Sequence, residues 1–489
     1  MTEFEELKML RSTSIGKNGY RSLHNGLQPT IKSLMRNPPA VNTNIQASGH
    51  IKSIRNAKNV TFLDVSDGSD HRALNIVLQE PEKLQSMHFK MGQSIMVKGE
   101  WIKSKGNQDY ELTYNPSDSS HDIKIIGDVE EIYPIQKKHN SLTYLRNFPT
   151  LRHRTSTLAS VLRLRSFIEW KLFEFFNEND FTKVTPPIIT SSDCEGAGEQ
   201  FKIDKVVNND PNFKFFGKDT NLTVSTQLHL EALTLSLNRA WTLSPCFRAE
   251  DSNTNRHLSE FWMLEAEICY LDNLKQLTDF TELMIRYVTE KLSSDSLDVL
   301  QSRYNKQDIA LIQQRWQSIL LNNPWPKITY TEALEIINKT MLKGRLKGRL
   351  TWGDSIQTVH EKWLAGTHFQ SPVFITDYPT AVKPFYMPKS TPYDNEKPTV
   401  ACFDLILPEI GELVGGSLRE YQYDELLNEM KSRNMNIQDM EWYISTRRNG
   451  SVPHGGFGMG FDRLVAYLSG IENLKDVIPF PRVPEDCKC

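Results

Sequence analysis

The residues best suited to chemistry lie in three stretches, and the first is SPCFRAEDSNTNRHLSEFWMLEAEICY at 244–270. Its pattern predicts two strands around a polar loop at 251–259. Because alternate residues of a strand share a face, Arg248 and Glu250 should lie together on the first strand. The second strand should group four residues on one face: Phe261, Met263, Glu265 and Glu267. Charged side chains on such a face need partners or a ligand, although a solvated hairpin with surface ion pairs is the simpler alternative.

The second stretch, FDLILPEIGELVGGSLRE at 403–420, places acidic and basic residues around two glycines. Asp404, Glu412 and Arg419 flank Gly415 and Gly416. Two carboxylates beside a phosphate site commonly hold Mg²⁺ and leave its remaining positions to water and substrate. Glycines in a strand also let a ligand approach the backbone closely. An edge strand with a bulge explains the same pattern without any ligand.

The third stretch, HGGFGMGFDRLVAYLSG at 454–470, is a glycine-rich strand that runs into an amphipathic helix. It does not fit the dinucleotide fingerprint G-x-G-x-x-G, because Phe461 occupies the last position and no βαβ unit surrounds it. Arg463 in the first helical turn could meet a phosphate or stack on a base. A surface arginine at a helix start is the alternative.

The elements that must position these residues belong to a multidomain chain of 489 residues. No apolar run approaches the roughly 20 residues that cross a bilayer, so we expect no membrane segment. The six cysteines form no C-x-x-C pair, which argues against a disulfide framework or a cysteine zinc site. The composition predicts a soluble, intracellular protein.

The domain pattern changes along the chain. Alternating β-branched residues predict an OB-fold barrel over 44–128, and this fold often binds single-stranded nucleic acid. Phe62 is a candidate for stacking on a base, or it is part of the barrel core. A linker at 129–150 precedes an α+β domain at 151–489, an antiparallel sheet flanked by helices. Residues 272–370 have a helical pattern and look like an insertion.

The N-terminal extension, residues 1–43, is basic. From Leu7 to Leu63 there is no Asp or Glu, and the Ser-containing segment MLRSTSIGKNGYRSLHNGLQPTIKSLMR has the composition of a mitochondrial transit peptide. The acidic TEFEE ahead of it suits a presequence poorly, and a start at Met9 would remove it. We therefore predict the mitochondrial matrix, with a cytoplasmic protein carrying a basic nucleic-acid-binding tail as the alternative.

Together the three stretches resemble the signature motifs of class II aminoacyl-tRNA synthetases. FRAEDSNTNRHLSEFWMLE and GFGMGFDRL carry the resemblance, which extends from Ser48 to the terminal IPFPRVP. Within that class the chain is most similar to the asparaginyl enzymes of the aspartyl, asparaginyl and lysyl subclass. The resemblance implies that the barrel binds the anticodon of tRNA(Asn), that ATP and L-asparagine are substrates, and that Mg²⁺ assists.

The resemblance also implies roles for five residues around the nucleotide. Arg248 should contact the α-phosphate and the amino-acid carboxylate, and Glu250 and His257 should contact ATP. Phe261 should stack under adenine. Arg463 should cover the other face of adenine and reach the terminal phosphate of ATP.

Other positions match the family's metal and amino-acid sites. Asp404 and Glu412 match the Mg²⁺ ligands. Glu195 and Gln227 match residues that hold the substrate α-amino group. The helix and strand of 155–190 resemble the motif that forms a homodimer interface.

The choice of asparagine over aspartate depends on the pocket for the substrate side chain. Aspartyl enzymes carry a Lys three residues after the match to Gln227, and this chain has Leu230. Where they have an Asp, it has Glu265. Arg419 and Glu265 would offer donors and an acceptor, which complement an amide, whereas an aspartate carboxylate would oppose Glu265.

The reaction that the resemblance implies has two steps. The asparagine carboxylate attacks the ATP α-phosphorus, and the terminal 3′-hydroxyl of the tRNA then attacks the acyl carbon of the adenylate. Two rivals remain: a paralogue that makes asparagine from aspartate, which would lack the barrel, and a non-catalytic tRNA-binding protein, which would have lost motif residues.

Overall fold

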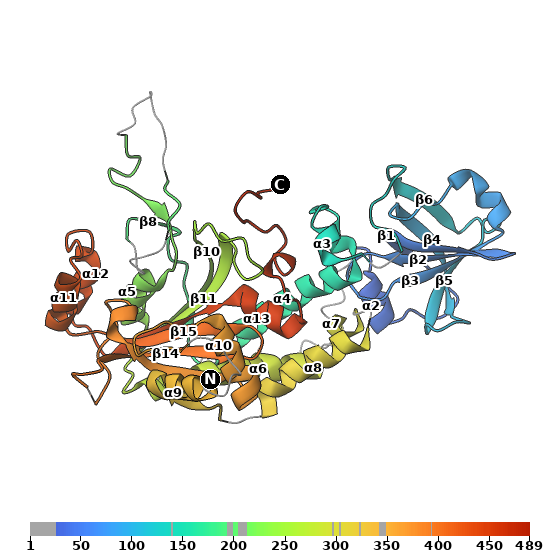
Figure 1. The fold of residues 1–489 in the computed structure, drawn as a ribbon. Helices are drawn as coiled ribbons and strands as arrows, with labels where there is room; N and C mark the ends of the chain where they lie inside the picture. Colours follow the sequence, from blue (N-terminus) through green and yellow to red (C-terminus); the bar gives the residue numbers. More distant parts are fainter. Residues whose placement is uncertain are drawn as a thin grey trace, which may run out of the picture. The chain divides into compact units, whose positions relative to one another are not determined.

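The computed structural model describes residues 26–137, 140–192, 199–203, 213–295, 298–302, 305–321, 324–341, 349–392 and 394–489. The chain divides into two compact units, one ending at Tyr144 and the other beginning at Leu145 (Figure 1). Glu195 and the first 25 residues of the predicted extension lie outside the described residues. Within the described part, no helix is both long and apolar enough to span a bilayer.

The first unit is a β-barrel whose strands alternate between a buried and an outer face. Strand β1 pairs with β2 along one part and with β4 along another, which closes the order β1-β2-β3-β5-β4, and β6 adds to β4. Leu63, Val65 and Trp101 are completely buried inside. The strands are β1 (Thr43–Asn56), β2 (Val60–Ser66), β3 (Leu74–Gln79), β4 (Ser94–Lys103), β5 (Tyr110–Tyr114) and β6 (Asp122–Gly127).

Phe62 lies between two buried residues of β2 and faces the other way, outside the barrel core. It is half-buried, and the guanidinium carbon of Arg55, its partner on β1, lies 5.4 Å from the ring centroid. A short helix α2 (Ile31–Arg36) precedes the barrel, and the Thr30 hydroxyl caps it by accepting from Ser33 N at 3.1 Å.

The second unit is built on an eight-stranded, largely antiparallel sheet in the order β12-β13-β14-β15-β16-β11-β10-β7. The strands are β7 (Thr182–Lys183), β10 (Arg239–Phe247), β11 (Glu260–Cys269), β12 (Lys327–Thr329), β13 (Val373–Pro379), β14 (Thr399–Leu407), β15 (Gly411–Arg419) and β16 (His454–Gly460). The strand expected at the end of 155–190 is instead two short ones, β7 and β8 (Ile189–Thr190), because Pro186 and Pro187 lie between them and proline has no N–H to donate. β8 pairs with β9 (Asn221–Leu222) outside the main sheet.

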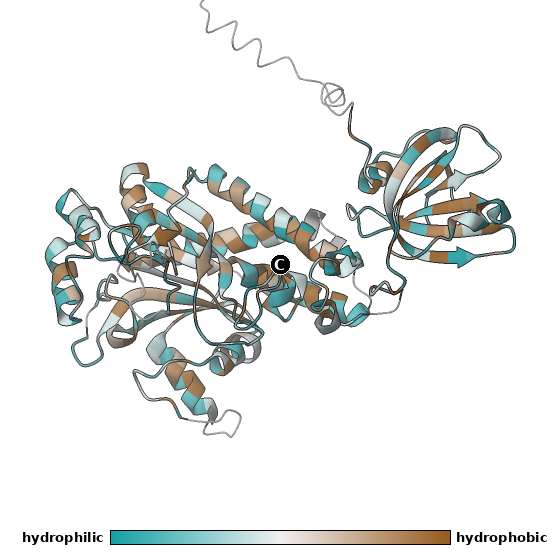
Figure 2. Ribbon diagram, turned by 90° about the horizontal axis from the view of Figure 1, so that it is seen from above, coloured by the Kyte–Doolittle hydropathy of each residue, from teal (hydrophilic) through white to brown (hydrophobic). Residues whose placement is uncertain are grey.

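Helices flank this sheet, and Figure 2 shows hydrophobic and hydrophilic residues interleaved along them, as expected of elements with one buried side. Helix α13 packs on β11 and on α4. The segment 272–370 is mostly helical, but β12 within it forms the edge of the main sheet. The helices that follow the barrel are α3 (Leu142–Leu145), where the two units meet in the sequence, and then α4 (Ser156–Glu178), α5 (Gln227–Leu237), α6 (Leu274–Asp295), α7 (Asp298–Gln301), α8 (Lys306–Leu321), α9 (Tyr330–Met341), α10 (Thr358–Trp363), α11 (Tyr423–Ser432), α12 (Glu441–Arg448) and α13 (Phe461–Ser469).

Candidate active site

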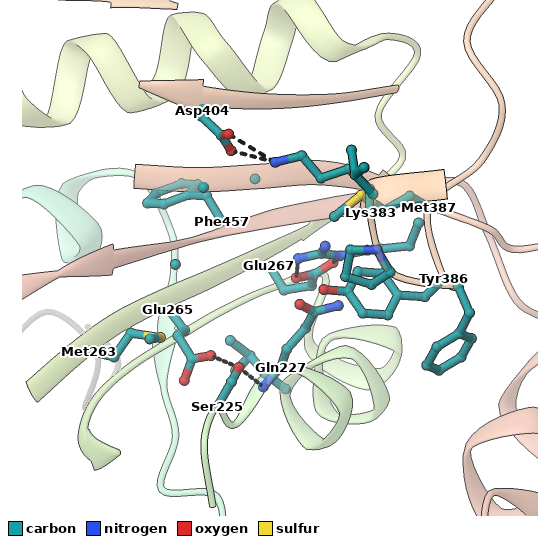
Figure 3. Close-up of a pocket in the computed structure, with 18 of the residues that line it drawn as sticks. Ser225, Gln227, Met263, Glu265, Glu267, Lys383, Tyr386, Met387, Asp404 and Phe457 are labelled. Atoms are coloured by element: carbon teal, nitrogen blue, oxygen red, sulfur yellow. Dashed lines mark hydrogen bonds and ion pairs between the residues drawn. The ribbon is translucent and has the colours of Figure 1, made fainter. Parts of the chain in front are cut away.

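Two adjoining cavities lie over the central strands of the sheet in the second unit. The larger has a volume of about 630 Å³, and the smaller about 160 Å³. Arg248, Met263, Glu412 and Gly458 line both, so the two cavities form one continuous site. Figure 3 shows the side chains of the larger cavity. All three sequence stretches contribute to this site, although they are far apart in the chain.

Strand β11 lines both cavities. Phe261 lines the smaller cavity, Met263 lines both, and Glu265 and Glu267 line the larger one. These four residues of β11 therefore share one face of the strand, as predicted. The prediction for the preceding strand was wrong. Strand β10 ends at Phe247, so Arg248 and Glu250 lie in the following loop rather than on a strand face.

Two backbone hydrogen bonds place this loop. Arg248 N donates to Ser259 O at 3.0 Å, and Ala249 N donates to Glu199 O at 2.8 Å. The Arg248 guanidinium carbon lies 5.5 Å from the ring centroid of Phe261. A cation over one face of an aromatic ring is thus fixed at the junction of the two cavities.

The smaller cavity has aromatic side chains and several cations. Phe261 and Trp262 are the aromatic residues, and Arg256 and Arg463 line the cavity together with His257 and Glu250. His257 is held by the hydroxyls of Thr254 and Ser252, at 2.6 and 3.1 Å from Nδ1. Burial lowers its pKa, and the nearby arginines add to that effect. Such a lining suits a planar base with an attached polyphosphate.

Arg463 is placed by the strand-to-helix turn from β16 into α13. The neighbouring Asp462 anchors this turn, because its carboxylate accepts from Trp262 N at 2.8 Å and pairs with Arg165 of α4. Arg463 itself donates from an Nη atom to the Glu412 carbonyl at 3.0 Å. The third stretch therefore joins the second at the smaller cavity.

Asp404 and Glu412 point to the same place from neighbouring strands. A Cβ atom on Gly415 would lie 3.6 Å from Asp404 Oδ1 and 3.4 Å from Glu412 Oε1, so this glycine leaves the space between them open. Burial raises the pKa of Asp404 and the charge of Glu412 raises it further, whereas Lys383, with Nζ 2.9 Å from both carboxylate oxygens, lowers it.

These two carboxylates fit a hard divalent cation that keeps water or phosphate in its other positions. Among the described residues, no group of three or more His, Cys, Asp or Glu side chains could hold a metal alone. The pair therefore suits a metal that arrives with its phosphate ligand rather than a fully enclosed protein site.

Arg419 and Glu265 both line the larger cavity, as the sequence argument expected, but the carboxylate that pairs with Arg419 is that of Glu267. Its Nε and one Nη donate to the two carboxylate oxygens of Glu267 at 3.0 and 3.1 Å, and its other Nη donates to Ser417 Oγ at 2.6 Å. Glu265 instead accepts from the Ser225 hydroxyl and from both the N–H and hydroxyl of Thr226. The N–H and hydroxyl groups at the start of α5 therefore hold the Glu265 carboxylate.

A second buried carboxylate, Glu231, lies behind Arg419. One of its oxygens accepts from Tyr443, Arg447 and His454 at 2.7, 2.6 and 3.1 Å. The other accepts from Gln227 Nε2 at 3.0 Å and lies 3.8 Å from Arg419 Nε. Burial alone would raise the pKa of Glu231, but Arg447, the His454 hydrogen bond and Arg419 hold it well below its usual value.

Most of the residues singled out from the sequence come together here. Gln227, Glu265, Asp404 and Arg419 line the larger cavity, and Glu250, His257, Phe261 and Arg463 line the smaller. Phe62 belongs to the other unit, and Glu195 is not described. The charged residues of the site and its support that sequence reasoning missed include Glu231, Arg256, Lys383, Arg433, Arg447 and, as the partner of Arg419, Glu267. Only Glu267, by its place in the alternation of β11, carried a usable signal.

Comparison with known proteins gives a consistent result. The family model described as tRNA synthetases class II (D, K and N) matches residues 140–484. The mitochondrial asparagine–tRNA ligase of Saccharomyces cerevisiae is 48% identical over 461 residues, covering 90% of this chain and 92% of that protein. The mitochondrial asparagine–tRNA ligase of Schizosaccharomyces pombe is 42% identical, covering 93% and 97%.

Solved structures resemble the whole chain as well. Asparaginyl-tRNA synthetase from Pyrococcus horikoshii, solved with asparaginyl-adenylate, has a TM-score of 0.80 at 27% identity and covers 94% of this chain and 99% of its own. The Entamoeba histolytica asparaginyl-tRNA synthetase has a TM-score of 0.77 at 25% identity, covering 92% and 98%. The predicted fold, a barrel followed by an antiparallel sheet with flanking helices, is confirmed.

Proposed function

The chain belongs to the class II tRNA synthetases of the aspartate, lysine and asparagine group, and from this membership we propose that it is an asparagine–tRNA ligase. It forms asparaginyl-adenylate from asparagine and ATP and then transfers the asparaginyl group to tRNA(Asn). The observation that carries this function is the position of Arg248, which lines both cavities at their junction. An amino-acid carboxylate in one cavity and an α-phosphate in the other would meet there.

ATP occupies the smaller cavity in this proposal. Adenine stacks on Phe261, Arg463 lies over its other face and reaches the terminal phosphate, and Glu250 and His257 contact the nucleotide. The Arg248–Phe261 contact supports this arrangement, because it places a cation next to the aromatic surface that would hold the base. The resemblance of the motif residues and the lining of the cavity support it together.

Asparagine occupies the larger cavity. Gln227 accepts from its α-ammonium group, and Glu195 is proposed to contact the same group. Arg419 donates to the side-chain carbonyl oxygen, and acidic side chains of β11 accept from the amide NH₂. The charge of Arg419 is already balanced by Glu267, so an aspartate carboxylate would gain no free counterion there.

The chemistry needs no side-chain nucleophile. The asparagine carboxylate attacks the α-phosphorus in line, the bond to the pyrophosphate oxygen breaks, and pyrophosphate leaves. The tRNA 3′-hydroxyl then attacks the acyl carbon and AMP leaves. Arg248 holds the two reacting groups together and stabilises charge that develops on the phosphate. Asp404 and Glu412 would hold Mg²⁺, which neutralises phosphate charge when bound.

The other expected partners follow from features outside these cavities. The outer face of the barrel, with Phe62 beside Arg55, supports anticodon binding by stacking. An apolar side chain on α4, Trp170, is 67% exposed, which supports a homodimer through this helix. The mitochondrial names of the fungal relatives support the mitochondrial matrix for this chain.

Amino-acid-dependent ATP–pyrophosphate exchange tests the proposal. The purified chain with Mg²⁺ should exchange label with asparagine and not with aspartate, and it should charge tRNA(Asn). Preference for aspartate would show an aspartyl enzyme instead. No exchange with either amino acid, in a protein that unfolds cooperatively, would revive the non-catalytic tRNA-binding alternative. The barrel already disfavours the asparagine-forming paralogue, since such enzymes lack one.

A further inference from the structure

The side-chain amide of Gln227 has an orientation that one neighbour dictates. Gln227 and Glu231 lie four residues apart on α5 and therefore on the same helix face. Gln227 Nε2 is 3.0 Å from Glu231 Oε1. An ionised carboxylate accepts hydrogen bonds and cannot donate them, so the nitrogen of the Gln227 amide must face Glu231, and its carbonyl oxygen must point elsewhere.

The carbonyl oxygen of Gln227 is available to the larger cavity. Gln227 is half-buried and lines that cavity, and Figure 3 shows its side chain extending from α5 toward Glu267 and Tyr386. None of the described residues donates a hydrogen bond to this oxygen. An ammonium group has three N–H donors and no acceptor, so it needs an oxygen here and would be repelled by an NH₂ group.

Glu231 is itself held rigidly. Its side chain is fully buried, and its second oxygen accepts from Tyr443, Arg447 and His454, which belong to α12 and β16. Rotation of the carboxylate would leave several buried donors without an acceptor, which is costly. The first oxygen is thus directed at Gln227 by contacts that lie away from the cavity.

We propose that Glu231 is a positioning residue for the α-amino group of the amino-acid substrate. It turns the Gln227 amide so that the carbonyl oxygen, and not the NH₂ group, meets the substrate ammonium. This inference rests on the proposed function and adds to it a residue that does not itself touch the substrate. A glutamine at position 231 would have the same shape but could donate as well as accept, so it would allow the Gln227 amide to turn over.

The test compares two ligands that differ only in the group concerned. Asparagine is the substrate, and succinamate, which is asparagine without its α-amino group, serves as a competitive inhibitor of asparagine-dependent ATP–pyrophosphate exchange. Glu231→Gln should raise KM for asparagine by about 10- to 100-fold, the effect of one hydrogen bond to a charged group, with little change in kcat or in KM for ATP. The inhibition constant of succinamate should stay within about threefold of wild type.

A matched control separates positioning from support of the fold. Tyr443→Phe removes one donor to the far oxygen of Glu231 and leaves the contact with Gln227 in place. It should lower the melting temperature yet leave the ratio of asparagine KM to succinamate inhibition constant unchanged. In a Gln227→Met background, Glu231→Gln should no longer change this ratio, because there is no amide left to turn.

The outcomes are distinguishable. Equal weakening of asparagine and succinamate by Glu231→Gln, or an unchanged asparagine KM, would overturn the inference while wild-type exchange upholds the proposed function. Absence of asparagine-dependent exchange in the wild type would remove both. If Glu231→Gln does not fold, Glu231→Asp decides instead, because its shorter side chain withdraws the acceptor from Gln227 Nε2 and should raise the asparagine KM while it spares succinamate.

Discussion

Glu267 should control the preference for asparagine over aspartate through its pair with Arg419. Both side chains are buried, and the guanidinium gives two hydrogen bonds to the carboxylate at 3.0 and 3.1 Å. We expect Glu267→Gln to keep the shape of the site, retain one acceptor for Arg419 and leave one positive charge uncompensated. The carboxylate of an aspartate substrate could then pair with the Arg419 guanidinium, whose charge Glu267 neutralises in the wild type.

The size of the effect follows from the charges involved. A ligand carboxylate bound to the same guanidinium would lie about 6 Å from the Glu267 carboxylate, and at an effective dielectric constant of about 20 the two would repel by about 3 kcal/mol. Since about 1.4 kcal/mol corresponds to a factor of ten, the ratio of kcat/KM for aspartate to that for asparagine should rise by about 10- to 100-fold. Asparagine itself is neutral at this position and should lose much less.

The assay is ATP–pyrophosphate exchange with each amino acid, alongside the melting temperature. Glu265→Gln is the matched control, because Glu265 lines the same cavity but is bound by Ser225 and Thr226 rather than by Arg419. That variant should lose stability with a smaller change in the ratio. If Glu265→Gln relaxes the preference and a folded Glu267→Gln does not, the assignment of Glu267 is refuted and the pocket inferred from sequence is restored.

Three further outcomes are expected. Phe62→Ala should raise KM for tRNA by about tenfold or more in aminoacylation, the effect of one lost stacking contact, and leave tRNA-independent exchange unchanged. Glu412→Gln should raise the Mg²⁺ concentration for half-maximal exchange by about tenfold or more in a Mg²⁺ titration, because one anionic ligand is lost. Burial, with Arg152 adding to it, lowers the pKa of His153 from 6.5 to about 4, so stability should fall as the pH drops through that range. His153→Gln should remove about 1–2 kcal/mol of this loss, seen in urea unfolding at pH 7 and pH 4.5.

The sequence predicts the barrel and the face of β11 because both depend on local alternation. Strand β2 alternates around Leu63 and Val65, and β11 alternates from Phe261 to Glu267, so burial follows from the period of two. The same rule failed at Arg248, because nothing local marks the residue at which β10 gives way to a loop. Only tertiary contacts, such as the bond from Ala249 N to Glu199 O, fix that point.

The alternation of residues along one strand could not predict which glutamate of β11 pairs with Arg419, and the reason differs from that at Arg248. Glu265 and Glu267 share a face of β11, so alternation cannot decide which of them meets Arg419. Cross-strand register decides it, since Glu265 lies opposite Gly458 and Glu267 opposite Gly456 on β16. Register between strands nearly 190 residues apart depends on the completed sheet.

Gly456 shows how the glycine-rich stretch shapes the larger cavity without a side chain. A Cβ atom at this position would collide with the Glu267 carboxylate and with the Ala266 carbonyl. The glycine is therefore needed for the Glu267 side chain to lie flat across β16 and reach Arg419 on β15. At Gly456 the structure shows that the space a Cβ atom would take is filled by the carboxylate that pairs with Arg419. In the proposed function, one motif therefore serves the nucleotide through Arg463 and the choice of amino acid through an absent side chain.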